Sequence, residues 1–461
     1  MRIINNINEN LFREYDLRGI YGSDITEDVS YTIGRSFGSY IKKMGESKTI
    51  VGYDNRKSSP IITNALIKGI LDSGINVINL GLVTTPMYYY GRILHNLNTG
   101  IMVTASHNPK EYNGFKIAFS KLGNAYGKLI GDFKDFTYLG VFETGNGIET
   151  KIDIKEKYLN LLTSSINLGK KKIKVVFDCG NGTASTIIKD VLDKFNIEYY
   201  LLYCNSDSNF PNHVPDPCEH KNMKDLSKKV LELNYDLGVG IDGDADRVGI
   251  VDEKGNIIGA DIYMAIMYKN LYKTLKKKKA LFDVKCSKTL IDEIDRLGLE
   301  KVMNRTGNSY AKKMMEEGDF DFGGEYSGHV FFRDKFPGFD DGIYAGLRMI
   351  ELISNIDKPL SYLTEDFNKY YSTEELKFKV TENTKFEIVN KVKEYAINKN
   401  YSIIDIDGVR VEFPYGWALV RASNTGPNIT VRFEANTLEK LNEIKEEFTT
   451  ELNRQIKRLL K

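Results

Sequence analysis

From about residue 48 the chain alternates short apolar runs with amphipathic stretches that end near glycine. The run KTIVGYD is followed by SSPIITNALIKGILDSG and then by INVINLG, an order that predicts strand, helix, strand. A similar pattern recurs in TIVGYDNRKSSP, IKVVFDCGNGTAS and ALFDVKCSKTL. In each, an apolar run ends in Asp, and a turn that contains Ser or Thr leads into a helical stretch. The repetition predicts three related α/β units, although Asp and Ser are common N-caps and such turns also arise without repeats.

After about Pro359 the pattern changes. A helical stretch, NTKFEIVNKVKEYAINKN, is followed by the short apolar runs SIIDI, VRVEF, GWALVRA and NITVRFEA, and a charged amphipathic helix begins at Leu438. Because helices and strands no longer alternate strictly, this part predicts a smaller α+β domain with an antiparallel sheet from about residue 368. Segment 205–220 carries three prolines and no periodicity, so it is predicted to be a loop.

Length and charge limit the classes of protein that remain. At about 150 residues per domain, 461 residues predict three domains or four small ones. The net charge of +1 gives no reason to expect nucleic acid or an anionic membrane as a partner. The N-terminus lacks the apolar core of a signal peptide, no apolar run reaches membrane-spanning length, and the four cysteines have no paired spacing. These features predict a cytoplasmic protein with reduced thiols.

The first stretch with candidate chemistry is VTASHNPKEYNGFKIAF, residues 103–119. An apolar run ends in a polar turn that holds Ser106 and His107, and Lys116 follows shortly after. A serine on the turn after a strand is well placed to point its hydroxyl into a crevice at the sheet edge. The alternative is a capped turn, and adjacent Ser and His residues make a poor hydrolase dyad.

The second stretch is LGVGIDGDADRVGIVDE, residues 237–253. Asp242, Asp244 and Asp246 alternate with small residues after an apolar strand, and carboxylates this close repel one another unless a hard cation neutralises them. Oxygen-only ligands favour Mg²⁺ over zinc. A calcium loop competes, since Glu253 falls at its twelfth position, but Arg247 stands where that loop needs Gly.

The third stretch is FGGEYSGHVFF, residues 322–332. Glu325, Ser327 and His329 alternate, so in an extended conformation their side chains would share one face. A carboxylate and a hydroxyl on one face suit a polyol ligand. A bulged strand with an incidental histidine is the alternative.

The fourth stretch is RASNTGPNITVRFEA, residues 421–435. A turn between strands brings together a guanidinium, hydroxyls and backbone N–H groups, which is one way to hold a phosphate, although an ordinary hairpin turn is the alternative. The residues are Arg421, Ser423, Asn424 and Thr425. Together, a nucleophile, an acidic triad, a polyol strip and a phosphate cradle, one to each expected domain, indicate phosphoryl transfer on a sugar.

The motifs T-A-S-H-N-P, D-G-D-A-D-R, G-E-Y-S-G-H and R-A-S-N-T-G-P resemble, in this order and over the full chain, those of the α-D-phosphohexomutases, specifically the bacterial phosphomannomutase/phosphoglucomutase branch. The resemblance implies four domains around a central cleft, three of related mixed α/β fold and a C-terminal α+β domain with an antiparallel sheet. The expected domains are residues 1–152 with a phosphoserine loop, 153–256 with a metal-binding loop, 257–367 with a sugar-binding loop, and 368–461 with a phosphate-binding loop.

The resemblance also implies roles for single residues. Ser106 matches the serine that carries the phosphoryl group, and Asp242, Asp244 and Asp246 match the ligands of Mg²⁺, which a phosphate oxygen on Ser106 completes. The other implied residues are Lys116 as general acid or base, Arg18 and His329 in proton transfer, Glu325 and Ser327 on sugar hydroxyls, Arg421, Ser423, Asn424 and Thr425 on the non-transferred phosphate, and Tyr15, Arg247, Lys285 and Asn308 in the cleft.

Two positions depart from the family's pattern. Asn308 stands where close relatives often carry His; Asn can donate a hydrogen bond but cannot carry charge, so a proton-transfer role is not expected there. Tyr326 matches neither the mannose/glucose nor the glucosamine branch, which leaves the preferred sugar open.

The implied activity is reversible transfer of a phosphoryl group between the 1- and 6-positions of a hexose phosphate, mannose or glucose, through a phosphoserine. Mg²⁺ is the expected cofactor, hexose 1,6-bisphosphate the expected intermediate and activator, and hexose 1-phosphate and 6-phosphate the substrates; no obligate protein partner is expected. The alternatives are a phosphoglucosamine mutase, a sugar phosphatase and a non-catalytic sugar-phosphate-binding protein. A phosphatase has no need to grip a second phosphate, and the intact Ser106, Lys116 and aspartates argue against a non-catalytic protein.

Overall fold

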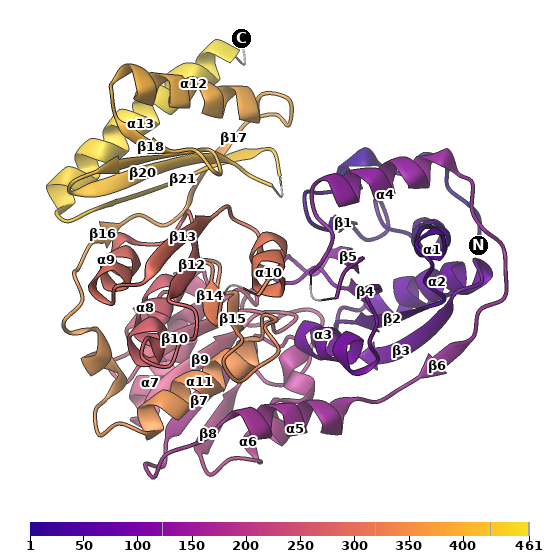
Figure 1. The fold of residues 1–461 in the computed structure, drawn as a ribbon, viewed down its shortest axis with the longest axis horizontal. Coiled ribbons are helices and arrows are strands. Elements are labelled where there is room, and N and C mark those ends of the chain that lie inside the picture. Colours follow the sequence, from indigo (N-terminus) through magenta and orange to yellow (C-terminus); the bar gives the residue numbers. More distant parts are fainter. Residues whose placement is uncertain (122, 319, 425, 460–461) are drawn as a thin grey trace.

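The computed structural model describes residues 1–121, 123–318, 320–424 and 426–459 (Figure 1). The described residues form three domains of mixed α/β structure followed by a domain with an antiparallel sheet, so the predicted fold class is confirmed. Within these residues, no helix has both the length and the apolar character needed to cross a membrane.

The sheet of the first domain runs in the order β1-β5-β4-β2-β3-β6. Its central strands are parallel, while β5 is antiparallel to both β4 and β1. The strands are β1 Leu17–Ile20, β2 Lys48–Tyr53, β3 Asn76–Leu82, β4 Gly100–Val103, β5 Tyr112–Ala118 and β6 Glu149–Lys151. The helices are α1 Glu27–Lys43, α2 Ser59–Asp72, α3 Thr85–Leu94 and α4 Lys128–Leu139.

The second and third domains repeat this plan with shorter sheets. The order is β11-β10-β9-β7-β8 in the second and β13-β12-β14-β15 in the third. The second contains α5 Lys155–Ser165, β7 Lys174–Asp178, α6 Ile188–Leu192, β8 Glu198–Leu202, α7 Lys224–Leu233, β9 Leu237–Ile241, β10 Val248–Asp252 and β11 Ile257–Ile258. The third contains α8 Ala260–Leu271, β12 Lys279–Asp283, α9 Lys288–Arg296, β13 Glu300–Asn304, α10 Asn308–Glu316, β14 Phe322–Gly324, β15 Val330–Phe332 and α11 Gly342–Ser354.

One four-strand motif is common to the three domains. Strands β3-β2-β4-β5, β8-β7-β9-β10 and β13-β12-β14-β15 have the same order, and in each the first three are parallel and the last is antiparallel. The prediction of three related α/β units is therefore confirmed. The turn before the antiparallel strand is residues 104–111, 242–247 and 325–329 respectively, and these turns contain the first three sequence motifs.

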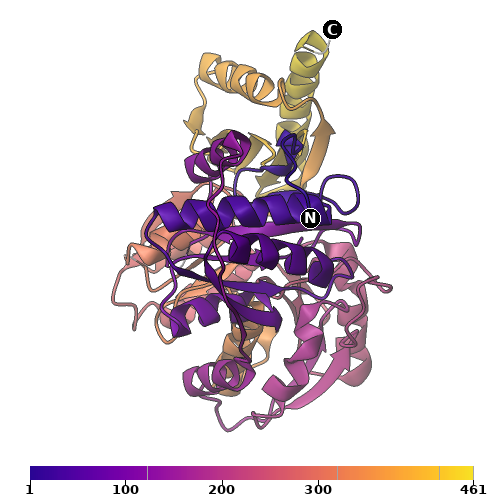
Figure 2. The ribbon, with the colours of Figure 1, turned by 90° about the vertical axis from the view of Figure 1, so that its right-hand side faces the viewer.

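The last domain packs one face of its sheet on the third domain and the other face on two helices. Strand β21 pairs with β16, β17 and β20, and β19 and β18 extend the sheet. The elements are β16 Tyr371–Ser372, β17 Leu376–Lys379, α12 Lys385–Asn398, β18 Ser402–Ile404, β19 Val409–Phe413, β20 Gly416–Ala422, β21 Asn428–Ala435 and α13 Leu438–Leu459. Figures 1 and 2 show α12 and α13 on the outer side, so that the sheet faces the rest of the molecule.

The hydrophobic cores explain how the domains hold together. The first domain and the last domain each have a core of their own, whereas a single large cluster joins the second and third domains and reaches into the first. Burial of this continuous apolar surface fixes the first three domains relative to one another. The last domain touches the third through a small apolar cluster that contains Val284, Trp417 and Leu419.

Candidate active site

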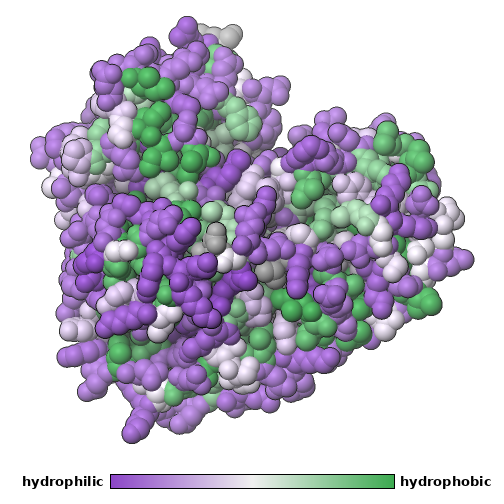
Figure 3. Space-filling view, in the orientation of Figure 1, coloured by the Kyte–Doolittle hydropathy of each residue, from purple (hydrophilic) through white to green (hydrophobic). Residues whose placement is uncertain are grey.

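A cavity of about 500 Å³ lies between the four domains, and polar residues gather at the hollow in the surface where the domains meet (Figure 3). Predicted site residues from all four domains line it: Tyr15, Arg18, Ser106, Lys116, Arg247, Lys285, Asn308, Glu325, Ser327, His329, Arg421, Ser423 and Asn424. The three aspartates are fully buried behind the lining. Thr425, also predicted for this site, lies outside the described residues.

Ser106 lies on the turn between β4 and β5 in an unusual backbone conformation. Its φ of +50° is in the left-handed region, which non-glycine residues adopt rarely and at a cost in energy, typically at functional sites. The hydroxyl donates a hydrogen bond of 2.8 Å to Asp242 Oδ2 across the domain boundary. The serine of the first motif and the acidic triad of the second therefore form one site.

A buried arginine that the sequence analysis did not identify holds this turn in place. Arg56 donates hydrogen bonds to four backbone carbonyls, those of Ser106 at 2.8 Å, Asn108 at 2.6 Å, Pro109 at 2.7 Å and Tyr112 at 3.1 Å. Its Nε also bonds Asp54, the residue directly after β2, at 3.1 Å. Asp54 is one of the Asp residues that recur after strands in the sequence pattern. By bonding Arg56, it helps to hold the turn that carries Ser106.

The acidic triad lies on the turn between β9 and β10, so the predicted apolar strand before it is present and a second strand follows it. The carboxylate oxygens of Asp242, Asp244 and Asp246 lie within 4.8 Å of one another. Oδ1 of Asp244 and Oδ1 of Asp246 are buried without a hydrogen-bond partner among the described residues. Free, buried carboxylate oxygens at this spacing fit a divalent cation with oxygen ligands.

Lys116 supplies positive charge to the same carboxylates. Its Nζ lies 2.6 Å from Asp244 Oδ2 and 2.6 Å from Asp246 Oδ2. Burial alone would lower the pKa of Lys116, but these two carboxylates raise it above its ordinary value. Asp242 has no such contact with Lys116, and its burial together with the charges of Asp246 and Asp244 raises its pKa well above the usual range.

His329 is held between a guanidinium and a buried carboxylate. Arg247 Nε donates a hydrogen bond of 3.0 Å to His329 Nε2, and Nδ1 of the same ring lies 2.7 Å from Asp340 Oδ2. Asp340 also lies 2.8 Å from Nζ of the fully buried Lys312 and accepts a 3.1 Å hydrogen bond from Asn308 Nδ2. In this arrangement Nε2 is the acceptor nitrogen, so the proton of a neutral ring belongs on Nδ1.

The segment predicted to bind the sugar, residues 325–329, is a turn rather than an extended segment. Glu325 and His329 close the end of the β14–β15 hairpin through a backbone hydrogen bond of 2.9 Å, and Gly328 has a φ of +86°. The prediction that alternation in an extended strand puts three side chains on one face is therefore wrong, because the residues lie in a tight turn. Glu325, Ser327 and His329 nevertheless line the same cavity, and Ser327 Oγ donates to Glu325 Oε2 at 3.2 Å.

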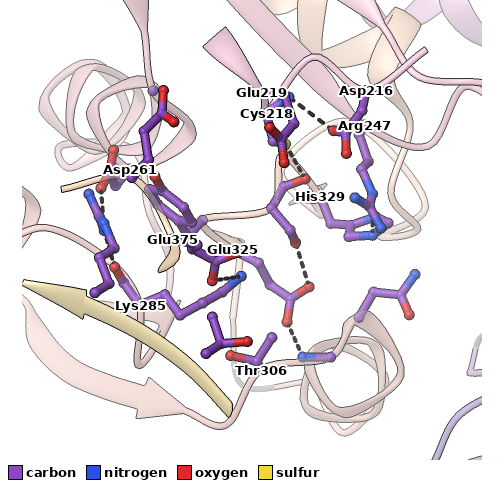
Figure 4. A pocket seen from close by; sticks show the side chains of 18 of the residues that line it. Asp216, Cys218, Glu219, Arg247, Asp261, Lys285, Thr306, Glu325, His329 and Glu375 are labelled. Atoms are coloured by element: carbon purple, nitrogen blue, oxygen red, sulfur yellow. Dashed lines mark hydrogen bonds and ion pairs between the residues drawn. The ribbon is translucent and has the colours of Figure 1, made fainter. Parts of the chain in front are cut away.

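Cations of the third and last domains line one side of the cavity, among them Lys285, which Figure 4 labels. Arg421 is the penultimate residue of β20 rather than part of the turn that follows, and its Nε donates to Asp407 at 2.9 Å. Its Nη2 and the amide nitrogen of Asn424 are buried without a partner among the described residues. Lys285, on the turn after β12, lies 3.2 Å from Glu375. Unpartnered donors beside cations suit an oxyanion.

Protein-family models for phosphoglucomutase/phosphomannomutase match most of the chain. Alpha/beta/alpha domain I matches residues 9–128, domain II residues 156–255, domain III residues 259–370, and the C-terminal domain residues 375–451.

Individual relatives are similar over nearly the full length. The phosphomannomutase/phosphoglucomutase of Pseudomonas aeruginosa is 40% identical over 96% of this chain and 95% of its own. The phosphoglucomutase of Neisseria meningitidis serogroup A is 36% identical over 96% of each chain. The crystal structure of a phosphoglucomutase/phosphomannomutase family protein from Burkholderia thailandensis covers 98% of both chains with a TM-score of 0.89 and 33% identity.

Proposed function

Because the chain belongs to the phosphoglucomutase/phosphomannomutase family, we propose that it moves a phosphoryl group between the 1- and 6-positions of a hexose phosphate, with Ser106 as the carrier. The proposal rests mainly on two features of one cavity. On one side lies the strained Ser106, which is bonded to the acidic triad; on the other, Nη2 of Arg421 and the amide nitrogen of Asn424 have no partner among the described residues. A mutase needs both a phosphoryl carrier and a separate phosphate site, since its bisphosphate is held by one phosphate while the other is transferred.

The chemistry begins with phosphorylated Ser106. The free hydroxyl of a bound hexose monophosphate attacks the phosphorus, the bond from phosphorus to Ser106 Oγ breaks, and hexose 1,6-bisphosphate forms. The bisphosphate then turns over in the cavity, and Ser106 Oγ takes the other phosphoryl group by the reverse step. Charge spreads over the oxygens of the transferring group, so positioning and electrostatic stabilisation account for most of the rate.

Side chains around Ser106 suit the proton transfers. The raised pKa of Lys116 keeps it an ammonium, and its Nζ bonds Asp244 in the same triad whose Asp242 accepts from Ser106 Oγ. Lys116 would therefore be the nearby cation that stabilises, and in the end protonates, Ser106 Oγ as the phosphoryl group leaves. Arg18 donates to the carbonyl of Ala105 and to Asn108 Oδ1, both at 3.0 Å, and so grips the serine turn. Nε2 of His329 accepts a hydrogen bond from Arg247, and it would accept the hydroxyl proton when Arg247 turns toward the substrate.

The residues of the acidic triad fit Mg²⁺. Asp242, Asp244 and Asp246 would hold the ion, and Ser106 would add a ligand oxygen when phosphorylated. The bound ion supplies neutralisation of the phosphoserine and of charge on the transferring group.

The opposite side of the cavity would hold the sugar and the phosphate that stays. Glu325 and Ser327 are placed to bond sugar hydroxyls, while Arg421, Asn424 and Lys285 are placed to bond the phosphate. Tyr15, Arg247, Asn308 and Ser423 would complete the lining. A phosphate contact of Thr425, which lies outside the described residues, stays a prediction. A phosphatase would not need this second phosphate site. The preferred sugar, activation by added bisphosphate, the cytoplasmic location and the lack of an obligate protein partner stay predictions.

Labelling of Ser106 tests the proposal directly. Incubation with glucose 1,6-bisphosphate is expected to add the mass of one phosphoryl group to the wild-type protein, and an excess of glucose 6-phosphate is expected to remove it. Ser106→Ala should lose the label and lower kcat at least about a thousandfold, as removal of a nucleophile does. Ser120→Ala, an exposed serine near the end of β5, serves as the control and should behave as wild type. Mutase turnover by Ser106→Ala at the wild-type rate would refute the assignment.

A further inference from the structure

Glu375 lies where the chain enters the last domain, and its carboxylate lines the cavity on the side where Lys285 and Arg421 lie. It lies between β16 and β17, and its Oε1 is 3.2 Å from Lys285 Nζ of the third domain (Figure 4). The two side chains are 27% and 7% exposed, so water screens the pair only weakly. None of the sequence motifs includes this residue.

The surroundings of Glu375 are those of an anion-binding site. Burial alone would raise its pKa, but Lys285, Arg421 and Arg432 together lower it below the ordinary value. Arg432 stacks on the ring of Tyr326 at 3.9 Å from its centroid, and Lys285 lies 5.3 Å from the same centroid. The carboxylate is therefore ionised and pairs with Lys285, one of the cations that the substrate's phosphate would need.

A mutase requires a phosphate site that can be vacated. During each turnover the bisphosphate must release one phosphate from the cations, turn over, and bind again through the other. A site that gripped phosphate without competition would slow this exchange, because tighter binding of the ground state raises the barrier to leaving it. A carboxylate on the entry segment that replaces phosphate on Lys285 would lower that barrier.

Building on the proposed function, we propose that Glu375 is an internal competitor for the non-transferred phosphate. Glu375 pairs with Lys285 when the phosphate site is empty, and the phosphate of a bound hexose phosphate replaces it on Lys285. When the phosphate of the bisphosphate leaves Lys285, Glu375 pairs with Lys285 again. Glu375 is a positioning residue in this scheme, since it acts through Lys285 and makes no bond to the reacting atoms.

The test replaces the carboxylate by an amide of the same shape. In Glu375→Gln the dissociation constant for inorganic phosphate, measured by isothermal titration calorimetry, and the KM for glucose 1-phosphate should both fall about two- to fivefold, the range for loss of one competing ion pair. The kcat should fall with KM, because release of the intermediate's phosphate slows. Glu375→Asp keeps the charge and should restore values close to wild type.

The neighbouring residue provides a matched control. Glu374 has a side chain that is 73% exposed, so Glu374→Gln removes the same charge from the same segment and should leave all three constants unchanged. An unchanged or higher phosphate dissociation constant in Glu375→Gln, or a kcat that does not fall as KM falls, would overturn the proposal. Phosphate titration needs no turnover and Ser106 labelling needs no phosphate release, so failure of this inference is distinguishable from failure of the proposed function.

Discussion

At the scale of single residues, the conformation of Ser106 depends on a side chain that lies beneath it. A left-handed serine persists only where the surroundings hold it, and Arg56 holds the carbonyls on both sides of the turn through a planar guanidinium. A lysine at this position can keep the ion pair with Asp54 but has no fork of donors that reaches four carbonyls at once. Arg56 is therefore expected to position the phosphoryl carrier.

Arg56→Lys should lower kcat about ten- to a hundredfold with little change in KM, because the serine loses its alignment with Asp242 and not its substrate. The free energy of unfolding should fall by about 1–3 kcal/mol, as for other changes to a buried hydrogen-bond network. Steady-state kinetics and urea unfolding measure the two effects. Arg348→Lys, which alters another buried arginine paired with Asp334, should cost similar stability without loss of activity. Equal kcat values in the two variants would contradict the positioning role.

The sequence identified the residues that carry chemistry better than those that hold them in place. Ser106 and the triad stand out because their residue types and spacing are unusual on a turn. Arg56 and Asp340 do not stand out, since a charged residue in a sequence is normally exposed and only tertiary contacts reveal that these two are buried. Tyr326, which departs from the family's pattern, has its ring against Arg432.

At the scale of elements, the same strand-turn-strand hairpin presents three of the four motifs. The turns follow β4, β9 and β14, which are equivalent strands of one repeated motif. The carboxyl edge of each sheet therefore delivers its turn to the shared cavity. The sequence predicted the repeats from the Asp-containing turns after β2, β7 and β12, a different set of turns, because turn chemistry repeats in sequence while strand order is visible only in the folded sheet.

The turn between β9 and β10 carries a testable requirement for metal. Treatment with EDTA should abolish mutase activity and added Mg²⁺ should restore it, because three buried carboxylates cannot hold a phosphate dianion beside them without a cation. Activity is measured before and after dialysis, with EDTA saturated by Mg²⁺ as the control for effects of the chelator itself. Full activity in thoroughly chelated protein would show that Lys116 alone neutralises the triad.

At the scale of the whole molecule, the cavity depends on how the last domain meets the third. Arg410 donates to the carbonyls of Val284 at 2.7 Å and Cys286 at 2.9 Å, and Arg432 donates to that of Lys285. Trp417 lies beside both guanidinium groups. Three consecutive carbonyls of the turn that carries Lys285 are thus held by the domain that carries Arg421. No pattern in the sequence predicts this contact, since it joins residues more than 120 positions apart.

This contact between domains puts Arg421 at the cavity, where it would hold the second phosphate. A mutase needs that second phosphate site and a phosphatase does not, so Arg421 is the residue on which the two functions can be distinguished. If the last domain retains the bisphosphate while it turns over, Arg421→Ala should weaken binding of hexose phosphates about ten- to a hundredfold, since one charge-assisted contact of this kind is worth about 1.5–3 kcal/mol. The intermediate should also escape more often, so turnover should become more dependent on added glucose 1,6-bisphosphate to phosphorylate Ser106 again.

Phosphoryl exchange between bisphosphate and Ser106 should persist in Arg421→Ala, because that step takes place on the opposite side of the cavity. The measurement is the mutase rate with and without added bisphosphate, for the wild type and the variant, alongside Ser106 labelling. Nε of Arg421 donates a hydrogen bond to Asp407, so phosphate can bind only the other two nitrogens of the guanidinium. Of these, Nη2 has no partner among the described residues. An unchanged rate with an unchanged bisphosphate requirement would place the retained phosphate elsewhere and remove the argument that distinguishes this site from a phosphatase.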